Sequence, residues 1–243
     1  MSIKLTAAHH TAIGLRQRNE DCIGMKMPDD TELSTKGMIC AVADGVSGSE
    51  GGREAAEYAV HTLLTEYYAS PKSGEVVEVL DKVIGAINRQ ISARGALLPE
   101  RGGMATTLTA LVLRDTAYYF SHVGDTRLYR LRNDEFEQLT TDHVVDQSAK
   151  KHMLTRAIGL DSRVVIDHGT GKIETGDIFL LATDGVWAAL PEHELSWHLS
   201  ELVDDKRSAE GTAKLLVDAA LAAGSTDNLS VLVVRVDQLP EIR

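Results

Sequence analysis

The sequence predicts an α+β fold in which antiparallel β-sheets are covered by helices. Short apolar runs rich in β-branched and aromatic residues, which are typical of strands, occur in consecutive groups along the chain. Segments with helical periodicity lie between these groups and do not alternate strictly with single strands, as they would in a parallel doubly wound fold. The 243 residues, 43% of them hydrophobic, can bury a substantial core. Because no linker-like tract interrupts the chain, we expect one domain over residues 1–243.

The expected strands lie at residues 38–43, 106–113, 117–123, 127–131, 178–182 and 229–236. Each is short and mostly apolar, although apolar and polar residues alternate only roughly in the segment 127–131. The expected helices cover residues 53–69, 75–97, 191–203 and 208–223, where apolar residues recur with the helical period. Pro191 would suit the first helical position of the third helix, where the missing N–H of proline is not needed.

The charge balance limits the kinds of partner. The chain has 25 Lys and Arg against 36 Asp and Glu, for a net charge of −11. We therefore expect neither nucleic acid nor an anionic membrane as a partner, since both require clustered basic residues. We also expect no membrane span, because no apolar run approaches about 18 residues. Two cysteines, Cys22 and Cys40, are too few for a disulfide framework and suit a reducing cytoplasm.

Acidic residues stand at or beside the ends of expected strands at Asp44, Asp125, Asp184 and Asp227, and Glu20 and Asp21 close the segment GLRQRNED. At two of these places an apolar run leads directly into Asp-Gly-Val. One such Asp-Gly is most simply a turn, because it tolerates positive φ angles. A cluster of carboxylates would be destabilised by repulsion and desolvation unless cations compensated it. Oxygen-rich sites of this kind suit Mg²⁺ or Mn²⁺.

A series of motifs follows in order: GLRQRNED (14–21), ADGVSG (43–48), GGREAA (51–56), GGMATTL (102–108), VGDTRLY (123–129), LTTDH (139–143), LTRAIG (154–159), GDIFLLATDGVW (176–187) and STDNLSVLVV (225–234). The series, which covers residues 6–236, resembles the metal-dependent protein serine/threonine phosphatases of the protein phosphatase 2C type, in a bacterial form. The resemblance implies an αββα sandwich, with two antiparallel sheets face to face, helices on both outer faces and a metal centre at one end.

The resemblance also implies a role for most of the acids. Asp44 would bridge two Mn²⁺ or Mg²⁺ ions, and Gly45 would offer its backbone carbonyl to one of them. Asp184 and Asp227 would complete the coordination shell of the other ion. Glu20 and Asp21 would act mainly through water on the ions.

Three further positions carry implied roles or depart from the family pattern. Asp125 matches the family position for a third, weaker ion, although a strand-end acid that caps a turn and pairs with Arg127 is the alternative. Arg16 matches the arginine that binds substrate phosphate through a forked pair of hydrogen bonds, although an ordinary solvated arginine is the alternative. Val46 stands where many relatives have a histidine, so water on the third ion is expected to protonate the leaving group. The segment 144–153 lies where bacterial relatives carry a flap beside the active site, and it is shorter than that flap.

The implied reaction is hydrolysis of phosphoserine and phosphothreonine, on proteins modified by a serine/threonine kinase, by a water that bridges two ions. No Cys-x5-Arg loop is present, which removes the cysteine-phosphatase mechanism. Two other functions stay open: a regulatory phosphoprotein-binding module with little turnover, and a phosphatase for small phosphorylated metabolites. The complete acid set favours an active enzyme, since an inactive relative is expected to lose ligands.

Overall fold

The computed structural model describes residues 3–46, 51–71, 74–97, 103–145, 153–203 and 206–240. Its elements are, in chain order, β1 (Lys4–Ala12), β2 (Asp21–Lys26), α1 (Asp30–Lys36), β3 (Met38–Asp44), α2 (Gly52–Ala69), α3 (Val76–Gly95), β4 (Leu108–Arg114), β5 (Ala117–Val123), β6 (Arg127–Arg132), β7 (Glu135–Gln138), β8 (Asp167–Lys172), β9 (Ile178–Ala182), α4 (Asp184–Trp187), α5 (Glu192–Val203), α6 (Ala209–Ala222) and β10 (Leu229–Gln238).

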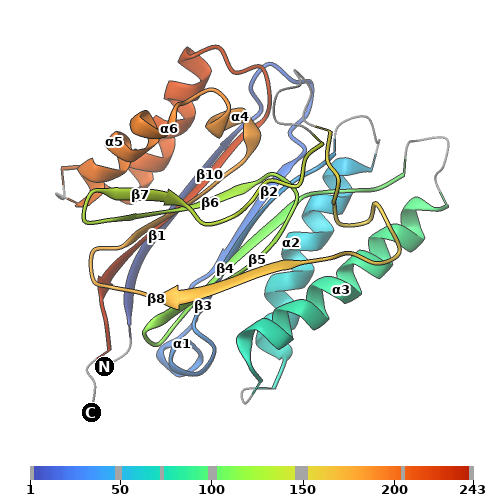
Figure 1. Ribbon diagram of the computed structural model, residues 1–243, viewed down its shortest axis with the longest axis horizontal. Helices are drawn as coiled ribbons and strands as arrows, with labels where there is room; N and C mark the ends of the chain where they lie inside the picture. The colour runs from blue at the N-terminus through green and yellow to red at the C-terminus, as the bar shows by residue number, and fades with distance from the viewer. Residues whose placement is uncertain are drawn as a thin grey trace.

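Two antiparallel five-stranded sheets form the centre of the molecule. One has the strand order β1-β10-β9-β6-β7, and the other has the order β2-β3-β4-β5-β8. Helices α5 and α6 lie against the first sheet, while α2 and α3 lie against the second (Figure 1). The predicted α+β fold, an αββα sandwich, is confirmed.

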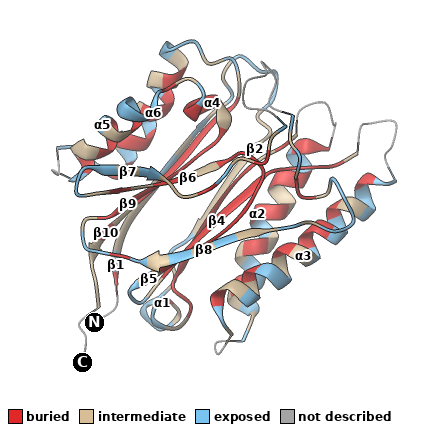
Figure 2. Ribbon diagram, viewed as in Figure 1, coloured by how far each residue is buried: buried red, intermediate tan, exposed pale blue. Residues whose placement is uncertain are grey.

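Strand alternation divides the buried residues into three layers. Along β3, Ile39 and Ala41 pack against α2 and α3, whereas Cys40 and Val42 pack against the opposite sheet. Strand β10 alternates in the same way between the α5–α6 layer and the layer between the sheets. The central strands are therefore buried along their length, and the covering helices turn their buried side inwards (Figure 2). Burial of both faces explains why these strands are continuous apolar runs in the sequence.

All four predicted helices and the predicted strands are present, but β1, β2, β7, β8, α1 and α4 were not predicted. Strand β8 shows the reason most clearly, because it contains Gly169 and Gly171. The rings of Phe120 and Tyr118, on the neighbouring β5, fill the space where side chains at these glycines would stand. Strand β8 is thus formed by packing across the sheet rather than by strand-favouring residues of its own.

The start of helix α5 differs from the prediction in a way that changes the role of a residue. Helix α5 begins at Glu192, so Pro191 precedes the helix instead of occupying its first position. The carbonyl of Pro191 accepts hydrogen bonds from the N–H groups of Glu194 and Leu195, which makes it the residue that caps the helix start.

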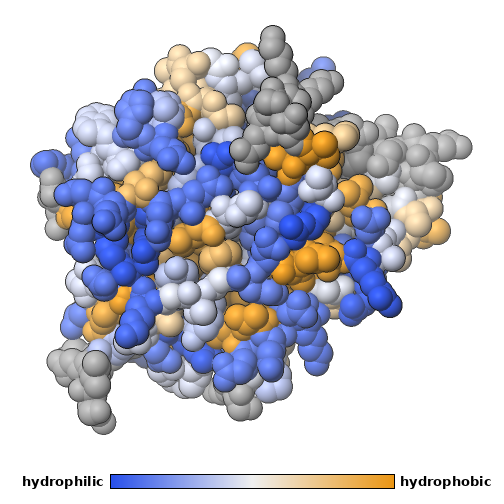
Figure 3. All heavy atoms as spheres, viewed as in Figure 1, coloured by the Kyte–Doolittle hydropathy of each residue, from blue (hydrophilic) through white to orange (hydrophobic). Residues whose placement is uncertain are grey.

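Hydrophilic residues cover most of the face shown in Figure 3, with hydrophobic patches between them. Among the residues with described structure, no helix combines the length and the apolar character needed to cross a bilayer.

Candidate metal centre

The predicted acids are brought together at one end of the sandwich. Asp21, the first residue of β2, lies opposite Asp44, the last residue of β3, in the ladder between these strands. In the other sheet, β9 ends directly before Thr183, and β10 begins shortly after Asp227. The Thr183 hydroxyl donates a hydrogen bond to Asp21 Oδ2 at 3.0 Å. This bond joins the two sheets at the edge where the acids lie.

The sequence places Asp184 at the end of a strand, but in the structure Asp184 belongs to a helix. Strand β9 stops at Ala182, Thr183 occupies the N-cap position, and Asp184 is the first residue of the one-turn helix α4. The Thr183 carbonyl accepts hydrogen bonds from the N–H groups of Val186 and Trp187, whereas its hydroxyl binds Asp21 and does not cap the helix. The indole N–H of Trp187 donates to the backbone carbonyl of Asp125 at 3.1 Å, which fixes α4 against the loop after β5.

Burial and mutual repulsion raise the pKa of these carboxyl groups. Burial, together with the charges of Asp184 and Asp227, raises the pKa of Asp21 to about 7. Burial and then the charges of Asp21 and Asp184 hold the pKa of Asp44 well above its usual range. Burial and the charge of Asp184 raise the pKa of Asp125 to about 7. A bound cation would relieve this repulsion and favour the ionised forms.

One carboxylate oxygen supports a metal site directly. Asp21 Oδ1 is buried and has no hydrogen-bond partner among the described residues, an unusual state for a buried carboxylate oxygen. In their present orientations, no three Asp, Glu, His or Cys side chains of the described ranges form a group that could hold a metal ion. The all-oxygen donor set fits Mg²⁺ or Mn²⁺ in its chemistry, and binding would require these carboxylates to turn towards a common point.

Backbone hydrogen bonds fix the end of β3. The N–H of Asp44 donates to Thr107 Oγ1 at 2.8 Å, and Thr106 Oγ1 donates to the carbonyl of Asp44 at 2.8 Å. The N–H of Gly45 donates to the carbonyl of Glu20 at 3.1 Å. Glu20, Asp44 and Gly45 are therefore held on one rigid piece of backbone, which favours precise placement of ligands.

Arg16 lies at the acid cluster. It belongs to the loop between β1 and β2, and its Nη2 is 2.6 Å from Asp227 Oδ2. The Arg16 side chain is 41% exposed, so its guanidinium is accessible to solvent. The motif that contains Arg16 predicts a role in binding substrate phosphate but gives no sign of this ion pair, which joins residues 211 positions apart.

Two glycines let neighbouring segments approach the backbone at Asp227 and Asn228. Gly14 has φ +61°, and a Cβ there would lie 2.0 Å from the carbonyl oxygen of Asp227. A Cβ on Gly185 would lie 2.0 Å from the carbonyl oxygen of Asn228. Both the loop that carries Arg16 and helix α4 therefore pack directly on this segment.

Two residues of this site are not among those predicted from the sequence. Thr183 orients Asp21 through the hydrogen bond described above, and Asn228 binds the loop that contains Arg16. A signal for each was present, because Thr183 directly precedes Asp184 and Asn228 directly follows Asp227. Residues 47 and 48 of the second motif, residue 102 of the fourth, and residues 146–152 of the expected flap lie outside the described residues.

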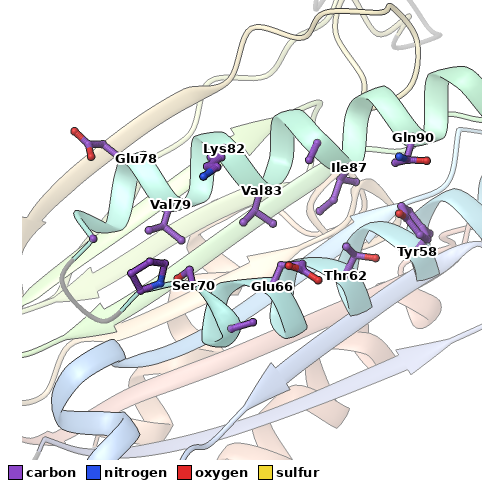
Figure 4. A pocket seen from close by; sticks show the side chains of 14 residues that line it. Tyr58, Thr62, Glu66, Ser70, Glu78, Val79, Lys82, Val83, Ile87 and Gln90 are labelled. Carbon is purple, nitrogen blue, oxygen red and sulfur yellow. The ribbon is translucent and has the colours of Figure 1, made fainter.

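A groove of about 580 Å³ lies elsewhere, between helices α2 and α3. Tyr58, Thr62 and Glu66 of α2 face Val79, Val83 and Ile87 of α3 across it (Figure 4). None of the predicted site residues lines this groove. This groove therefore does not identify the site; the convergence of acids does.

Comparisons with known proteins agree with the fold. The family model described as protein phosphatase 2C matches residues 16–223. The serine/threonine phosphatase Stp of Listeria innocua is 31% identical over 238 residues, which cover 90% of this chain and 91% of that protein. The structure of PppA, a key regulatory component of T6SS in Pseudomonas aeruginosa, matches with a TM-score of 0.81 at 27% identity over 97% of this chain and 99% of PppA.

The catalytic domain of the serine/threonine protein phosphatase PstP, solved in complex with two manganese ions, matches with a TM-score of 0.81 at 26% identity. The match covers 96% of this chain and 99% of the PstP domain. The chain belongs to the protein phosphatase 2C family of serine/threonine phosphatases.

Proposed function

We propose that this protein hydrolyses phosphoserine and phosphothreonine on proteins with the help of two Mn²⁺ or Mg²⁺ ions. The observation that carries the proposal is the cluster of mutually repelling carboxylates at one end of the sandwich, with an exposed arginine beside it. The manganese ions in the PstP structure support the choice of metal. The match to the family over residues 16–223 supports one phosphatase domain within residues 1–243.

The residues that would hold the two central ions are Glu20, Asp21, Asp44, Gly45, Asp184 and Asp227. When bound, such ions supply a nucleophilic water at neutral pH and neutralise the charge that develops on the phosphoryl oxygens. The protein's own part is to hold the carboxylates on strand ends and on helix α4, where packing limits their movement.

Arg16 would bind the phosphate group. Its guanidinium already reaches the acid cluster through Asp227, and its exposed position leaves donors accessible to an incoming phosphate. Asp125 would hold a third, more weakly bound ion, and it lies close enough to Asp184 for the two charges to interact. Because Val46 replaces the histidine of many relatives, the proton for the leaving group would come from water at Asp125.

The substrates would be phosphoproteins of a serine/threonine kinase, and the two free cysteines suit action in the cytoplasm. The test is hydrolysis of a phosphothreonine peptide by the purified protein with Mn²⁺, after EDTA, and after Mn²⁺ is restored. We expect turnover that EDTA abolishes and Mn²⁺ recovers. Activity that survives complete chelation would refute the metal mechanism. Faster hydrolysis of sugar phosphates would indicate a metabolite phosphatase, and binding of the peptide without turnover would indicate a regulatory module.

A further inference from the structure

A single buried side chain binds both ends of the loop that carries Arg16. Asn228 is 4% exposed. Its Nδ2 donates to the carbonyl of Ile13 at 2.8 Å and to the carbonyl of Arg18 at 2.9 Å. Its Oδ1 accepts a hydrogen bond from the N–H of Glu20 at 2.8 Å. These three groups lie at the two ends of the connection between β1 and β2, and Arg16 lies between them.

A primary amide is the side chain that this position requires. It offers two donors and an acceptor on a short, rigid group, and here both donors and the acceptor are used. A carboxylate of the same shape would place negative charge against two backbone carbonyls. A shorter hydroxyl would not reach both ends of the loop.

The backbone of Asn228 also fixes the partner of Arg16. Its N–H donates to Asp227 Oδ1 at 2.8 Å, while Asp227 Oδ2 faces the guanidinium of Arg16 at 2.6 Å. The same residue therefore orients Asp227 through its main chain and the Arg16 loop through its side chain. The close approach at Gly14 and Gly185 keeps this segment from shifting.

We propose that Asn228 is the positioning residue for substrate phosphate, because it holds the loop so that Arg16 stays beside the acid cluster. The inference rests on the proposed role of Arg16. Loss of the three side-chain hydrogen bonds of Asn228 would leave a loop that must be ordered again each time phosphate binds, and this ordering weakens phosphate binding. Asp227 is held by the N–H of Asn228, and the carbonyl of Glu20 still accepts from the N–H of Gly45 at 3.1 Å, so both acids would keep their places and metal binding would change little.

The test compares Asn228→Ser and Asn228→Asp with a matched control. Asn88 is a second buried amide, 1% exposed, which donates to the carbonyl of Asp161 at 3.0 Å and accepts from the N–H of Gly159 at 2.7 Å. Asn88→Ser and Asn88→Asp therefore remove similar side-chain to backbone hydrogen bonds at a different turn. The measurements are kcat and KM on a phosphothreonine peptide, Ki for inorganic phosphate, and the Kd of Mn²⁺ by calorimetry.

We expect Asn228→Ser to raise KM and the phosphate Ki by about tenfold, with a larger rise for Asn228→Asp, and to leave the Mn²⁺ Kd within about twofold. The Asn88 variants should leave both KM and Ki near the original values. In the double variant Arg16→Lys/Asn228→Ser, the rise in Ki should stay below the product of the two single rises, because both changes act through Arg16.

Several outcomes would overturn the inference: an unchanged Ki in Asn228→Ser, an equal loss of Mn²⁺ affinity, fully multiplicative effects in the double variant, or failure of both Asn228 variants to fold while the Asn88 variants fold. The proposed function has a separate check. If Arg16→Lys alone binds phosphate normally, the role of Arg16 is wrong. If Arg16→Lys is impaired and the Asn228 variants are normal, only the role of Asn228 is wrong.

Discussion

Buried carboxylates occur in two different settings in this molecule. On β6, Arg132 donates from Nε and Nη2 to the two oxygens of Asp177, both at 2.6 Å, and the Asp177 side chain is fully buried. Arg127 binds Asp142 in a similar way, with Nη2 at 2.7 Å from Oδ2. Each of these acids has its counter-ion supplied by the protein.

Three acids of the candidate metal centre have no such partner within the described ranges, whereas Asp227 pairs with Arg16. Among the residues that the structure describes, Asp21, Asp44 and Asp125 form no ion pair, and burial raises the pKa of each. The difference separates two uses of a buried carboxylate. Where the acid has a structural role, an arginine balances it, and where a cation from solution is to bind, the repulsion between acids is left in place. The same Asp→Asn substitution should therefore have opposite consequences in the two settings.

The largest effect is expected at the metal centre. Asp44→Asn keeps the shape of the side chain but removes a ligand charge, so turnover on a phosphothreonine peptide with Mn²⁺ should fall about a thousandfold. In EDTA the variant should be as stable as the original protein or more so, because a repelled charge is gone. Steady-state kinetics and urea unfolding at pH 8 measure the two quantities. Turnover near the original value would contradict the assignment of Asp44.

The same substitution at an arginine-paired acid should act on stability instead. Asp177→Asn removes the buried counter-ion of Arg132, leaves it paired with the exposed Glu174, and should lower the free energy of unfolding by about 3 kcal/mol. Turnover per folded molecule should hardly change. Asp237→Asn is the control, because Asp237 pairs with Arg235 at a more exposed position and should lose less than about 1 kcal/mol. Similar losses in the two variants would show that burial does not distinguish these pairs.

A buried histidine provides a comparison that depends on pH. His122 is fully buried, its ring centroid is 4.8 Å from that of His143, and Asp142 and Asp167 are the acids near it. Burial, followed by the charge of His143, lowers the pKa of His122 to about 4. A histidine in the unfolded chain titrates near 6.5. The stability contributed by neutral His122 is therefore complete above pH 6.5 and is lost as the pH falls towards 4.

The loss should reach about 2 kcal/mol at pH 5. In His122→Gln this component is absent, so the change in unfolding free energy between pH 7 and pH 5 should be smaller by that amount. The raised carboxyl groups of the metal centre titrate in both proteins, and their contribution cancels in the difference. Urea unfolding in EDTA at the two pH values measures it. Equal changes in the two proteins would show that His122 ionises freely in the fold.

The sequence predicted those parts of the fold whose cause is local. Strand β3 could be found because its residues are apolar on both faces, and Asp44 could be placed because it ends that strand. Strand β1 could not be found, since the segment KLTAAHHTA has no strong strand pattern and is ordered by pairing along its length with β10. Helix α4 was missed because an apolar run into Asp-Gly also fits a strand followed by a turn.

The same distinction holds for the site. The acids could be named from motifs that lie within short segments of the chain. The contacts of Arg16 and Asn228 join the first strands to the last one, so they depend on the packing of the two sheets and leave only a weak local signal.

The smallest effect is expected at Asp125, which lies between the two settings. The sequence left open an ion pair between Asp125 and Arg127, but the structure directs Arg127 elsewhere. Its Nε and Nη2 donate to Asp142, its Nη1 donates to Tyr129, and its guanidinium lies 3.5 Å from the centre of the Trp187 ring. Asp125 therefore resembles the acids of the metal centre, and its removal should not lower stability.

Asp125→Ala should leave the melting temperature in EDTA unchanged or higher, and should slow hydrolysis of a phosphothreonine peptide by about tenfold. That is less than the 10²–10⁴ typical of a dedicated general acid, because solvent water can still supply the proton. An aryl phosphate, whose leaving group departs without a proton, should be spared. Asp142→Asn is the structural control, since it breaks a buried arginine pair and should lower the melting temperature without this preference between substrates. Equal losses on both substrates in Asp125→Ala, accompanied by a lower melting temperature, would place Asp125 with the arginine-paired acids and remove its role in protonating the leaving group.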